Sequence, residues 1–180
     1  MAVREIIRMG HPTLRQQARP VAHKELGSPA LLALVDDMIE TLHEAGGIGL
    51  AAPQVNESIQ LAIIEIAGGG SRYGEIPAIP LTVFINPVIE VVDDAPAGYW
   101  EGCLSVPGLR GFVERPQHVK VRALNMEGHS FELELKGFLA TVFQHELDHL
   151  QGKLYIDRLK APSLLVFEDM LGLDQRVLEA

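Results

Sequence analysis

The stretch Gly137-Phe-Leu-Ala-Thr-Val-Phe-Gln-His-Glu-Leu-Asp-His-Leu-Gln-Gly152 decides the fold. Apolar side chains cover a wide surface of this segment at helical spacing. They are Phe138, Leu139, Val142, Phe143, Leu147 and Leu150. Gly137 opens the predicted helix, and Gly152 is the glycine expected at its C-terminal cap. We therefore expect a helix that is buried almost all round, with the rest of the chain packed about it.

Three polar residues stand within one turn of this apolar helix. Because a helix turns about every 3.6 residues, the imidazoles of His145 and His149 project from one face and form a two-point clamp for a metal ion. Glu146 lies about 60° around the helix from His149, within reach of a water on the ion. The alternative is two ordinary core histidines and a solvated carboxylate. Buried ionisable groups without a partner cost several kcal/mol, which favours the metal site.

A catalytic ion usually takes three protein ligands and leaves one position for water. Downstream of His149, Asp157 and Glu168 are carboxylates, but neither stands at the spacing of the common zinc proteases. Cys103 is the better candidate, since it ends a predicted strand next to a glycine that permits close approach. A thiolate and two imidazoles suit Fe²⁺, Zn²⁺ or Ni²⁺, and the residues themselves leave the metal open.

A first helix is predicted near the N-terminus. Ser28 is a typical N-cap, Pro29 suits the first helical position, and Gly46-Gly47 ends the pattern. One apolar stripe runs between these limits, formed by Leu31, Val35, Met38, Ile39 and Leu42. We interpret this stripe as core rather than as a cofactor site.

Between the helices the pattern changes to strands. We predict strands at 59–66, 82–85 and 88–92, and a β-hairpin over residues 117–136 around the turn Asn125–Gly128. Strands grouped between helices indicate an α+β fold, mainly antiparallel sheets packed around the central buried helix with its HExxH motif. Residues 1–180 should form a single catalytic domain.

Two segments stand outside this pattern. Residues 67–80 contain three consecutive glycines and two prolines, so we expect a flexible surface loop. Residues 160–180 are expected to form a short C-terminal tail, with one helix from Pro162 to Leu171.

The composition narrows the classes of function. The net charge of −9 and the pI near 5.2 disfavour direct binding to nucleic acid or to anionic membrane surfaces. A single cysteine excludes an intrachain disulfide and fits a reducing compartment. No apolar run approaches the length of a bilayer span, and the N-terminal Met-Ala-Val-Arg-Glu leads into mixed polarity without the apolar core of a signal peptide. We expect a cytoplasmic protein.

Three segments together resemble the peptide deformylase family in content, order and spacing. They are Gly47-Ile48-Gly49-Leu50-Ala51-Ala52-Pro53-Gln54, Glu101-Gly102-Cys103-Leu104-Ser105 and Gln144-His145-Glu146-Leu147-Asp148-His149. The resemblance covers roughly residues 3–159. It implies removal of the formyl group from the N-terminal formylmethionine of nascent polypeptides, with release of formate. The implied partners are those N-formylmethionyl chains and a transient contact with the ribosome, without direct nucleic-acid or membrane binding.

The resemblance also implies roles for individual residues. Cys103, His145 and His149 would hold one divalent ion, with Fe²⁺ as the first choice and Zn²⁺, Ni²⁺ or Co²⁺ as substitutes. Glu146 would act as acid and base. The side-chain amide of Gln54 and the backbone N–H of Leu104 would stabilise charge on the formyl oxygen.

The substrate side follows from the same resemblance. The peptide would lie along Gly47, Ile48 and Gly49 as an added strand. By position, Ile48, Leu104, Arg110 and Val142 would line the methionine pocket, although a surface role for Arg110 is an equally good interpretation.

Other features bear on the metal helix and on the tail. An ion pair of Arg115 with Asp148 would brace this helix. The region after Asp157 lacks the long basic helix of some bacterial forms, so the tail itself is not expected to dock on the ribosome.

Two competing functions remain open at this level. A zinc metallopeptidase shares HExxH but needs no thiolate ligand. A catalytically degenerate metal-binding member of the family would hold the ion without turnover, but such a protein requires neither Glu146 nor Gln54.

Overall fold

The computed structural model describes residues 2–71 and 74–171 of the chain. The predicted first helix is confirmed as α1, Pro29–Ala45. The Ser28 side chain caps it by accepting a hydrogen bond from the Leu31 backbone N–H at 3.3 Å. Gly46 ends it in the left-handed conformation, with φ of 63°, which a residue without a Cβ adopts readily.

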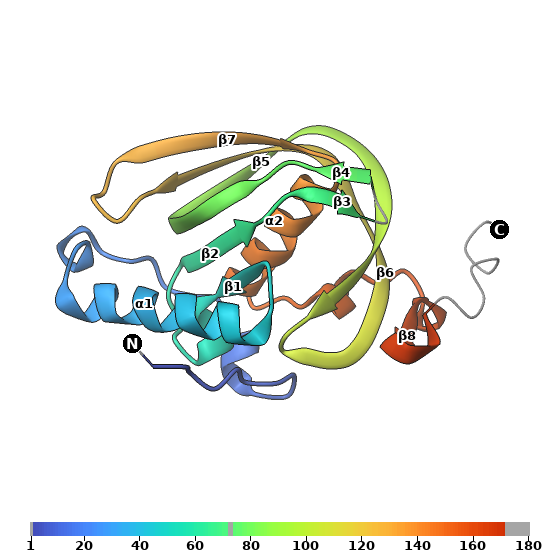
Figure 1. The fold of residues 1–180 in the computed structure, drawn as a ribbon, viewed down its shortest axis with the longest axis horizontal. Coiled ribbons are helices and arrows are strands. Elements are labelled where there is room, and N and C mark those ends of the chain that lie inside the picture. The colour runs from blue at the N-terminus through green and yellow to red at the C-terminus, as the bar shows by residue number, and fades with distance from the viewer. Residues whose placement is uncertain (1, 72–73, 172–180) are drawn as a thin grey trace.

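The main sheet is antiparallel throughout and has the order β1-β2-β5-β6-β7, with β8 paired to β6 (Figure 1). Its strands are β1 Gly49–Ala51, β2 Leu61–Ile66, β5 Ile79–Cys103, β6 Val106–Leu124, β7 Ser130–Lys136 and β8 Leu165–Phe167. Short 3-10 helices lie outside the sheet at Pro12–Arg15, His23–Glu25, Ala52–Val55, Tyr155–Arg158, Pro162–Leu164 and Glu168–Met170. The mostly antiparallel sheet, together with two α-helices in the described residues, agrees with the predicted α+β class.

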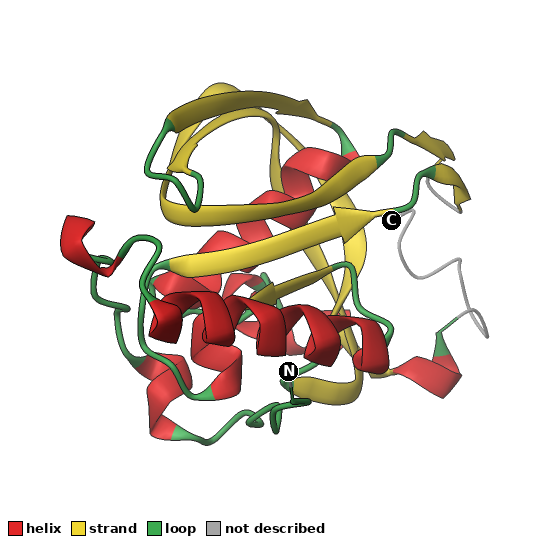
Figure 2. Ribbon diagram, turned by 60° about the vertical axis from the view of Figure 1, so that its left-hand side comes forward, coloured by secondary structure: helices red, strands yellow, loops and turns green. Residues whose placement is uncertain are grey.

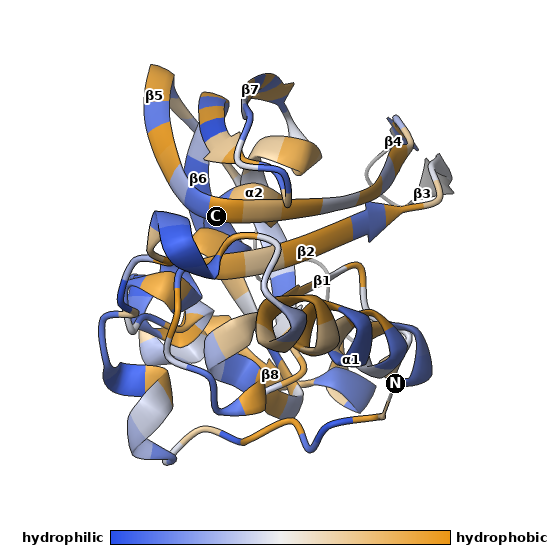
Figure 3. Cartoon of the chain, turned by 90° about the vertical axis from the view of Figure 1, so that its left-hand side faces the viewer, coloured by the Kyte–Doolittle hydropathy of each residue, from blue (hydrophilic) through white to orange (hydrophobic). Residues whose placement is uncertain are grey.

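Strand β2 separates the two helices, as Figure 2 shows. Its side chains alternate between two apolar clusters, because successive residues of a strand point to opposite faces. Leu61 and Ile63 pack in the cluster that contains the apolar stripe of α1. Ala62 and Ile64 pack in the cluster that contains the second helix, α2, Phe138–Leu150. Both faces of β2 are therefore covered, which explains its almost continuous hydrophobic colour in Figure 3.

Strands β5 and β6 are longer than the sequence pattern predicted. The separate strands expected at 82–85 and 88–92 belong to one strand, Ile79–Cys103, whose additional residues include three prolines and three acidic residues. Its pairing with β6 is irregular between Ile85 and Val88 and again between Asp93 and Pro96. Bulges accommodate prolines and extra residues within one bent strand, so these breaks were wrongly interpreted as strand ends. The strand still ends at Cys103, as predicted.

The predicted hairpin is confirmed as β6 and β7. Val119 pairs with Leu135 and Val121 with Leu133, across the turn formed by Asn125 and its neighbours. The Asn125 side chain stabilises this turn by accepting hydrogen bonds from backbone N–H groups of Glu127 and His129.

The second predicted helix is confirmed as α2, Phe138–Leu150. Eleven of its 13 residues are buried, including the three polar residues of the HExxH motif. It packs against β1, β2, β5, β6 and β7. Gly152 follows the cap residue Gln151 with φ of 68°, so it occupies the position expected for a terminating glycine.

Two predictions about irregular segments need correction. Residues 67–80 do not form a plain loop, because β3 Gly69–Ser71 and β4 Gly74–Ile76 pair as a small antiparallel sheet. The helix predicted from Pro162 to Leu171 is wrong, because β8 interrupts it and pairs with β6. Tertiary pairing there prevails over weak local helix preference. The remainder of the predicted tail, 172–180, lies outside the described residues.

No helix within 2–71 and 74–171 has the length and apolar character to cross a membrane.

Candidate metal centre

The end of strand β5 and the middle of α2 meet at three potential metal ligands. The ligand atoms of Cys103, His145 and His149 all lie within 4.8 Å of one another. The Cys103 Sγ atom is 3.4 Å from Nε2 of His149. The two histidines are four residues apart on the helix, and their rings stand edge to face with centroids 5.1 Å apart. The structure thus brings together the three residues selected from the sequence.

The geometry of this cluster fits a metal ion. Ligand atoms about 2.1 and 2.3 Å from a tetrahedral ion lie about 3.6 Å apart, close to the observed distance between sulfur and nitrogen. A buried carboxylate oxygen of Glu146, Oε2, has no hydrogen-bond partner among the described residues. A buried acceptor left open beside three ligand atoms is what a site for an ion and its water requires.

The orientation of His145 is set by Glu101. Nδ1 of His145 lies 2.7 Å from Oε2 of Glu101. A carboxylate accepts hydrogen bonds, so Nδ1 carries the hydrogen and Nε2 is left as the ligand atom. The ring of Tyr155 stacks on His145 with centroids 6.0 Å apart, and this contact limits ring rotation from the other side.

Arg115 joins Glu101 to Asp148. Its guanidinium donates to both Glu101 oxygens, at 2.6 and 3.0 Å, and to Oδ2 of Asp148 at 2.8 Å. The predicted pairing of Arg115 with Asp148 is therefore present. Asp148 also accepts from Arg158, through Nε at 3.1 Å and through the terminal nitrogen at 2.6 Å. This network links α2 to the strand that carries Cys103.

The electrostatics of the cluster favour a thiolate. Burial by itself raises the pKa of the Cys103 thiol, but the adjacent His149 and His145 hold that pKa well below its usual value. Burial lowers the pKa of His145, whereas its contacts with Cys103 and Glu101 raise it well above the usual value. The negative sulfur needs a cationic partner, and a metal ion can take the place of the imidazole proton.

Glu146 lies on the same helix with its carboxylate buried beside the ligand atoms. Burial raises the pKa of Glu146, and the neighbouring His145 and His149 oppose this shift. A Cβ atom on Gly49 would lie 2.5 Å from Oε1 of Glu146. Only glycine at that position of β1 leaves room for the carboxylate.

Gln54 is held at the opposite side of the cluster. Its Oε1 accepts a hydrogen bond from the Ala51 backbone N–H at 2.9 Å, so the amide nitrogen points the other way. That nitrogen lies 3.6 Å from Cys103 Sγ and 3.3 Å from Ser105 Oγ. Gln54 thus presents an amide donor at the cluster. Leu104 lies in the turn between β5 and β6 and lines the same pocket.

A pocket of about 510 Å³ opens over the cluster. Its lining contains every residue predicted to bind substrate, together with Glu146, the two predicted donors and two of the three cluster residues: Gly47, Ile48, Gly49, Gln54, Cys103, Leu104, Arg110, Val142, His145 and Glu146. The third cluster residue, His149, is not in this lining. Phe138, Trp100 and Leu109 add apolar surface. Arg115 and Asp148 are not in this lining and lie behind His145.

The two carboxylates weighed as third ligands lie elsewhere. Asp157 accepts from the Leu154 backbone N–H and pairs with Arg15. Glu168 pairs with Arg110 on β6. Neither belongs to the cluster of potential ligand atoms, whereas Cys103 does.

The sequence reasoning assigned no role to Glu101, Tyr155 or Arg158. Glu101 could have been found, because it stands two residues before Cys103 and so faces the same side of a strand. No local signal in the sequence indicates that Tyr155 stacks on His145 or that Arg158 contacts Asp148, since both contacts depend on the path of the chain after α2.

Comparison with known proteins identifies the relatives of this chain. A family model described as polypeptide deformylase matches residues 3–164. The peptide deformylase of Leptospira biflexa is 37% identical over 179 residues, which cover 99% of this chain and 100% of the relative. Peptide deformylase 1 of Bordetella pertussis is 46% identical over 158 residues, which cover 88% of each chain.

Solved structures agree. A class I type b peptide deformylase from Acinetobacter baumannii, solved with Met-Ala-Ser bound, is 38% identical with a TM-score of 0.80, over 88% of this chain and 99% of that one. A peptide deformylase from Thermotoga maritima is 36% identical with a TM-score of 0.78, over 89% of this chain and 100% of that one. The chain therefore belongs to the peptide deformylase family.

Proposed function

We propose that this protein hydrolyses the N-formyl group of formylmethionine at the start of nascent polypeptides and releases formate. The observation that supports this most directly is the buried Glu146 carboxylate, whose free oxygen faces a pocket beside three soft and borderline ligand atoms. We further propose that the chain acts as one catalytic domain, because the metal cluster combines residues of the main sheet and of α2. We propose a cytoplasmic location, because the single cysteine fits a reducing compartment.

Cys103, His145 and His149 would hold one divalent ion, for which we propose Fe²⁺. When bound, the ion supplies a water activated near neutral pH and polarises the formyl carbonyl. The thiolate donates charge to the ion, and Glu101 keeps Nε2 of His145 free for it.

Glu146 would move the proton. Its carboxylate accepts a proton from the attacking water and then delivers that proton to the leaving amine of methionine. A base serves this cycle best when its pKa lies near the working pH, and burial raises the pKa of Glu146 in that direction. The carboxylate occupies the space that a Cβ atom on Gly49 would fill, so the glycine lets it lie close to β1.

Gln54 and Leu104 would stabilise the formyl oxygen as it becomes negative. The Gln54 amide nitrogen is oriented before substrate binds, because the Ala51 backbone N–H holds the other end of the amide. Preorganised donors of this kind lower the barrier without a cost in reorganisation during the reaction.

The peptide would bind along the open edge of β1. Among residues 2–71 and 74–171, β1 pairs only with β2, so the backbone of Gly49 and its neighbours can add a further strand. Ile48, Leu104 and Val142 provide apolar surface for the methionine side chain. The relative from Acinetobacter baumannii was solved with Met-Ala-Ser bound, which supports a peptide with an N-terminal methionine as the ligand.

Formate release from a formyl-Met peptide tests the proposal. The protein is purified without oxygen and loaded with Fe²⁺, and metal content is measured together with turnover. We expect the Glu146→Ala variant to keep about one ion per chain and to lose turnover by a factor of about 10² to 10⁴. The matched control is Glu127→Ala in the turn between β6 and β7, an exposed glutamate that does not line the pocket, and this variant should leave turnover unchanged.

Protein that binds Fe²⁺ but releases no formate would indicate a catalytically degenerate metal-binding member of the family. Cleavage of unformylated peptides at internal bonds would instead favour a zinc metallopeptidase. A Cys103→Ser variant separates that case, because a peptidase of the HExxH type holds its zinc without a thiolate, whereas our proposal requires metal to be lost.

A further inference from the structure

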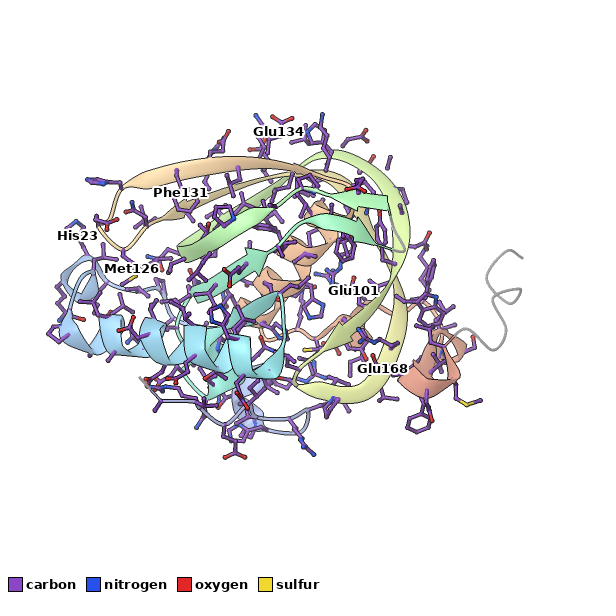
Figure 4. All side chains as sticks on the ribbon, viewed as in Figure 1. His23, Glu101, Met126, Phe131, Glu134 and Glu168 are labelled. Atoms are coloured by element: carbon purple, nitrogen blue, oxygen red, sulfur yellow. The ribbon has the colours of Figure 1, made fainter. Side chains whose placement is uncertain are left out.

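The C-terminal segment supplies one wall of the pocket. Strand β8 pairs with β6, so that Val166 lies opposite Arg110 and Phe167 opposite Leu109. Glu168 follows directly and, as the diagonal neighbour of Arg110, reaches back across β6. Figure 4 labels Glu168 where the C-terminal segment meets the lower part of β6. Glu168 lies beyond residues 3–164, the part of the chain that the family model matches, yet it lines the pocket.

Arg110 is held between two surfaces. Its Nε donates to Oε1 of Glu168 at 3.0 Å, and a terminal nitrogen contacts the same oxygen. On the other side its guanidinium rests on Gly102, where a Cβ atom would lie 2.0 Å from a guanidinium nitrogen. The Arg110 side chain is 32% exposed and that of Glu168 is 52% exposed. The pair therefore lies where the pocket opens to solvent.

The charge balance of the pocket mouth depends on this pair. Among the described residues that line the pocket, Arg110 is the one lysine or arginine. The other carboxylates there are Glu101, which Arg115 and His145 neutralise, and the buried Glu146. Without Glu168, a fixed positive charge would face the substrate residues that leave the methionine pocket toward solvent.

We propose, on the basis of the function proposed above, that Glu168 is a specificity-determining residue that acts through Arg110. It positions the guanidinium against Gly102 and offsets its charge. Formylated peptides with an acidic side chain after methionine consequently gain no advantage over neutral ones.

The test compares kcat/KM for formyl-Met-Ala-Ser, formyl-Met-Asp-Ser and formyl-Met-Ala-Asp, with the Fe²⁺-loaded protein. In Glu168→Gln we expect kcat/KM for the acidic peptides, divided by kcat/KM for the neutral peptide, to rise by a factor of about 2 to 5. This range is typical of one partly exposed charge pair. The change should shrink at high salt, because screening weakens interactions between exposed charges. Glutamine has nearly the same shape as glutamate, so the variant preserves the shape of the pocket lining at this position.

A matched control is Glu134→Gln, which changes the net charge equally. Glu134 contacts His118 and Lys136 on β6 and β7 and does not line the pocket. In Glu134→Gln the ratio of kcat/KM for acidic peptides to kcat/KM for the neutral peptide should equal that of the unmodified protein.

The double variant Arg110→Gln with Glu168→Gln tests whether Glu168 acts through Arg110. If Glu168 acts through Arg110, removing its charge in the Arg110→Gln background leaves the substrate ratio unchanged. A ratio that still shifts there would overturn the inference, as would a uniform fall in kcat/KM for all three peptides in Glu168→Gln. Absence of formate release by the unmodified protein would refute the proposed function itself, whereas normal turnover with an unchanged ratio in Glu168→Gln would refute only the role of Glu168.

Discussion

Helices α1 and α2 start from similar sequence patterns but treat their polar residues in opposite ways. Six of the 17 residues of α1 are buried, and its charged residues face solvent or pair near the surface, as Asp37 does with Arg4. Eleven of the 13 residues of α2 are buried, and they include four ionisable side chains. Each of these four contacts a group from another element or faces the pocket. An exposed charged residue on α1 can therefore be replaced at little cost, whereas each ionisable residue on α2 contributes to structure or chemistry.

The largest effect should follow from breaking the network behind α2. Arg115→Met removes the cation that neutralises Glu101 and Asp148, and Arg115 is only 4% exposed. Buried carboxylates left without their partner should lower the free energy of unfolding by about 3 to 5 kcal/mol. Urea unfolding of metal-free protein measures this. The control is Arg4→Met, which breaks the half-exposed pairs with Asp37 and Glu57 and should cost less than about 1 kcal/mol. Equal losses in both variants would contradict the comparison.

A smaller effect, confined to catalysis, is expected at the donor that faces α2 across the pocket. Gln54→Ala should lower kcat by a factor of about 10² with metal content unchanged, because one donor to the formyl oxygen is lost. Steady-state kinetics with parallel metal analysis checks this. An unaltered kcat would show that Gln54 only caps the loop through its hydrogen bond with Ala51.

The next effect concerns metal affinity. Asp148→Asn weakens the hydrogen bonds from Arg115 and Arg158. Arg115 is then held less firmly against Glu101, the residue that orients His145. We expect metal affinity to fall by a factor of about 10, as changes behind metal ligands typically cause. Competition with a chromophoric chelator measures it. If affinity stays the same, Asp148 stabilises the fold without tuning the metal centre.

The smallest effect is expected on α1. Ser28→Ala removes the side-chain acceptor for the Leu31 N–H and should lower the free energy of unfolding by about 1 kcal/mol. Turnover should not change, because α1 contributes no ligand to the metal cluster. Ser28→Asp, which restores an acceptor, should recover the loss. Thermal or urea unfolding beside a turnover assay separates the two readouts, and a drop in kcat would show that the helices are coupled through β2.

Prediction from sequence was accurate where local signals act alone. The limits of α1 follow from Ser28 and Gly46, and those of α2 from Gly137 and Gly152, because caps and glycines set backbone geometry within a few residues. The pair of histidines on one face of α2 follows from helical spacing. Strands were harder, because Pro87 and Pro96 signal breaks that β5 accommodates as irregular pairing with β6.

The sequence by itself determined the helix that carries His145, Glu146 and His149, and with its other two segments it determined the family. Only the tertiary structure decided which side chains complete the centre and how they are held. Glu101, Tyr155 and Arg158 act on the metal helix through contacts that depend on β5, on the chain after α2 and on their packing. Likewise, Glu168 meets Arg110 only because β8 pairs with β6. Local backbone preferences reach across a few residues, whereas burial and ion pairing join residues far apart in the chain.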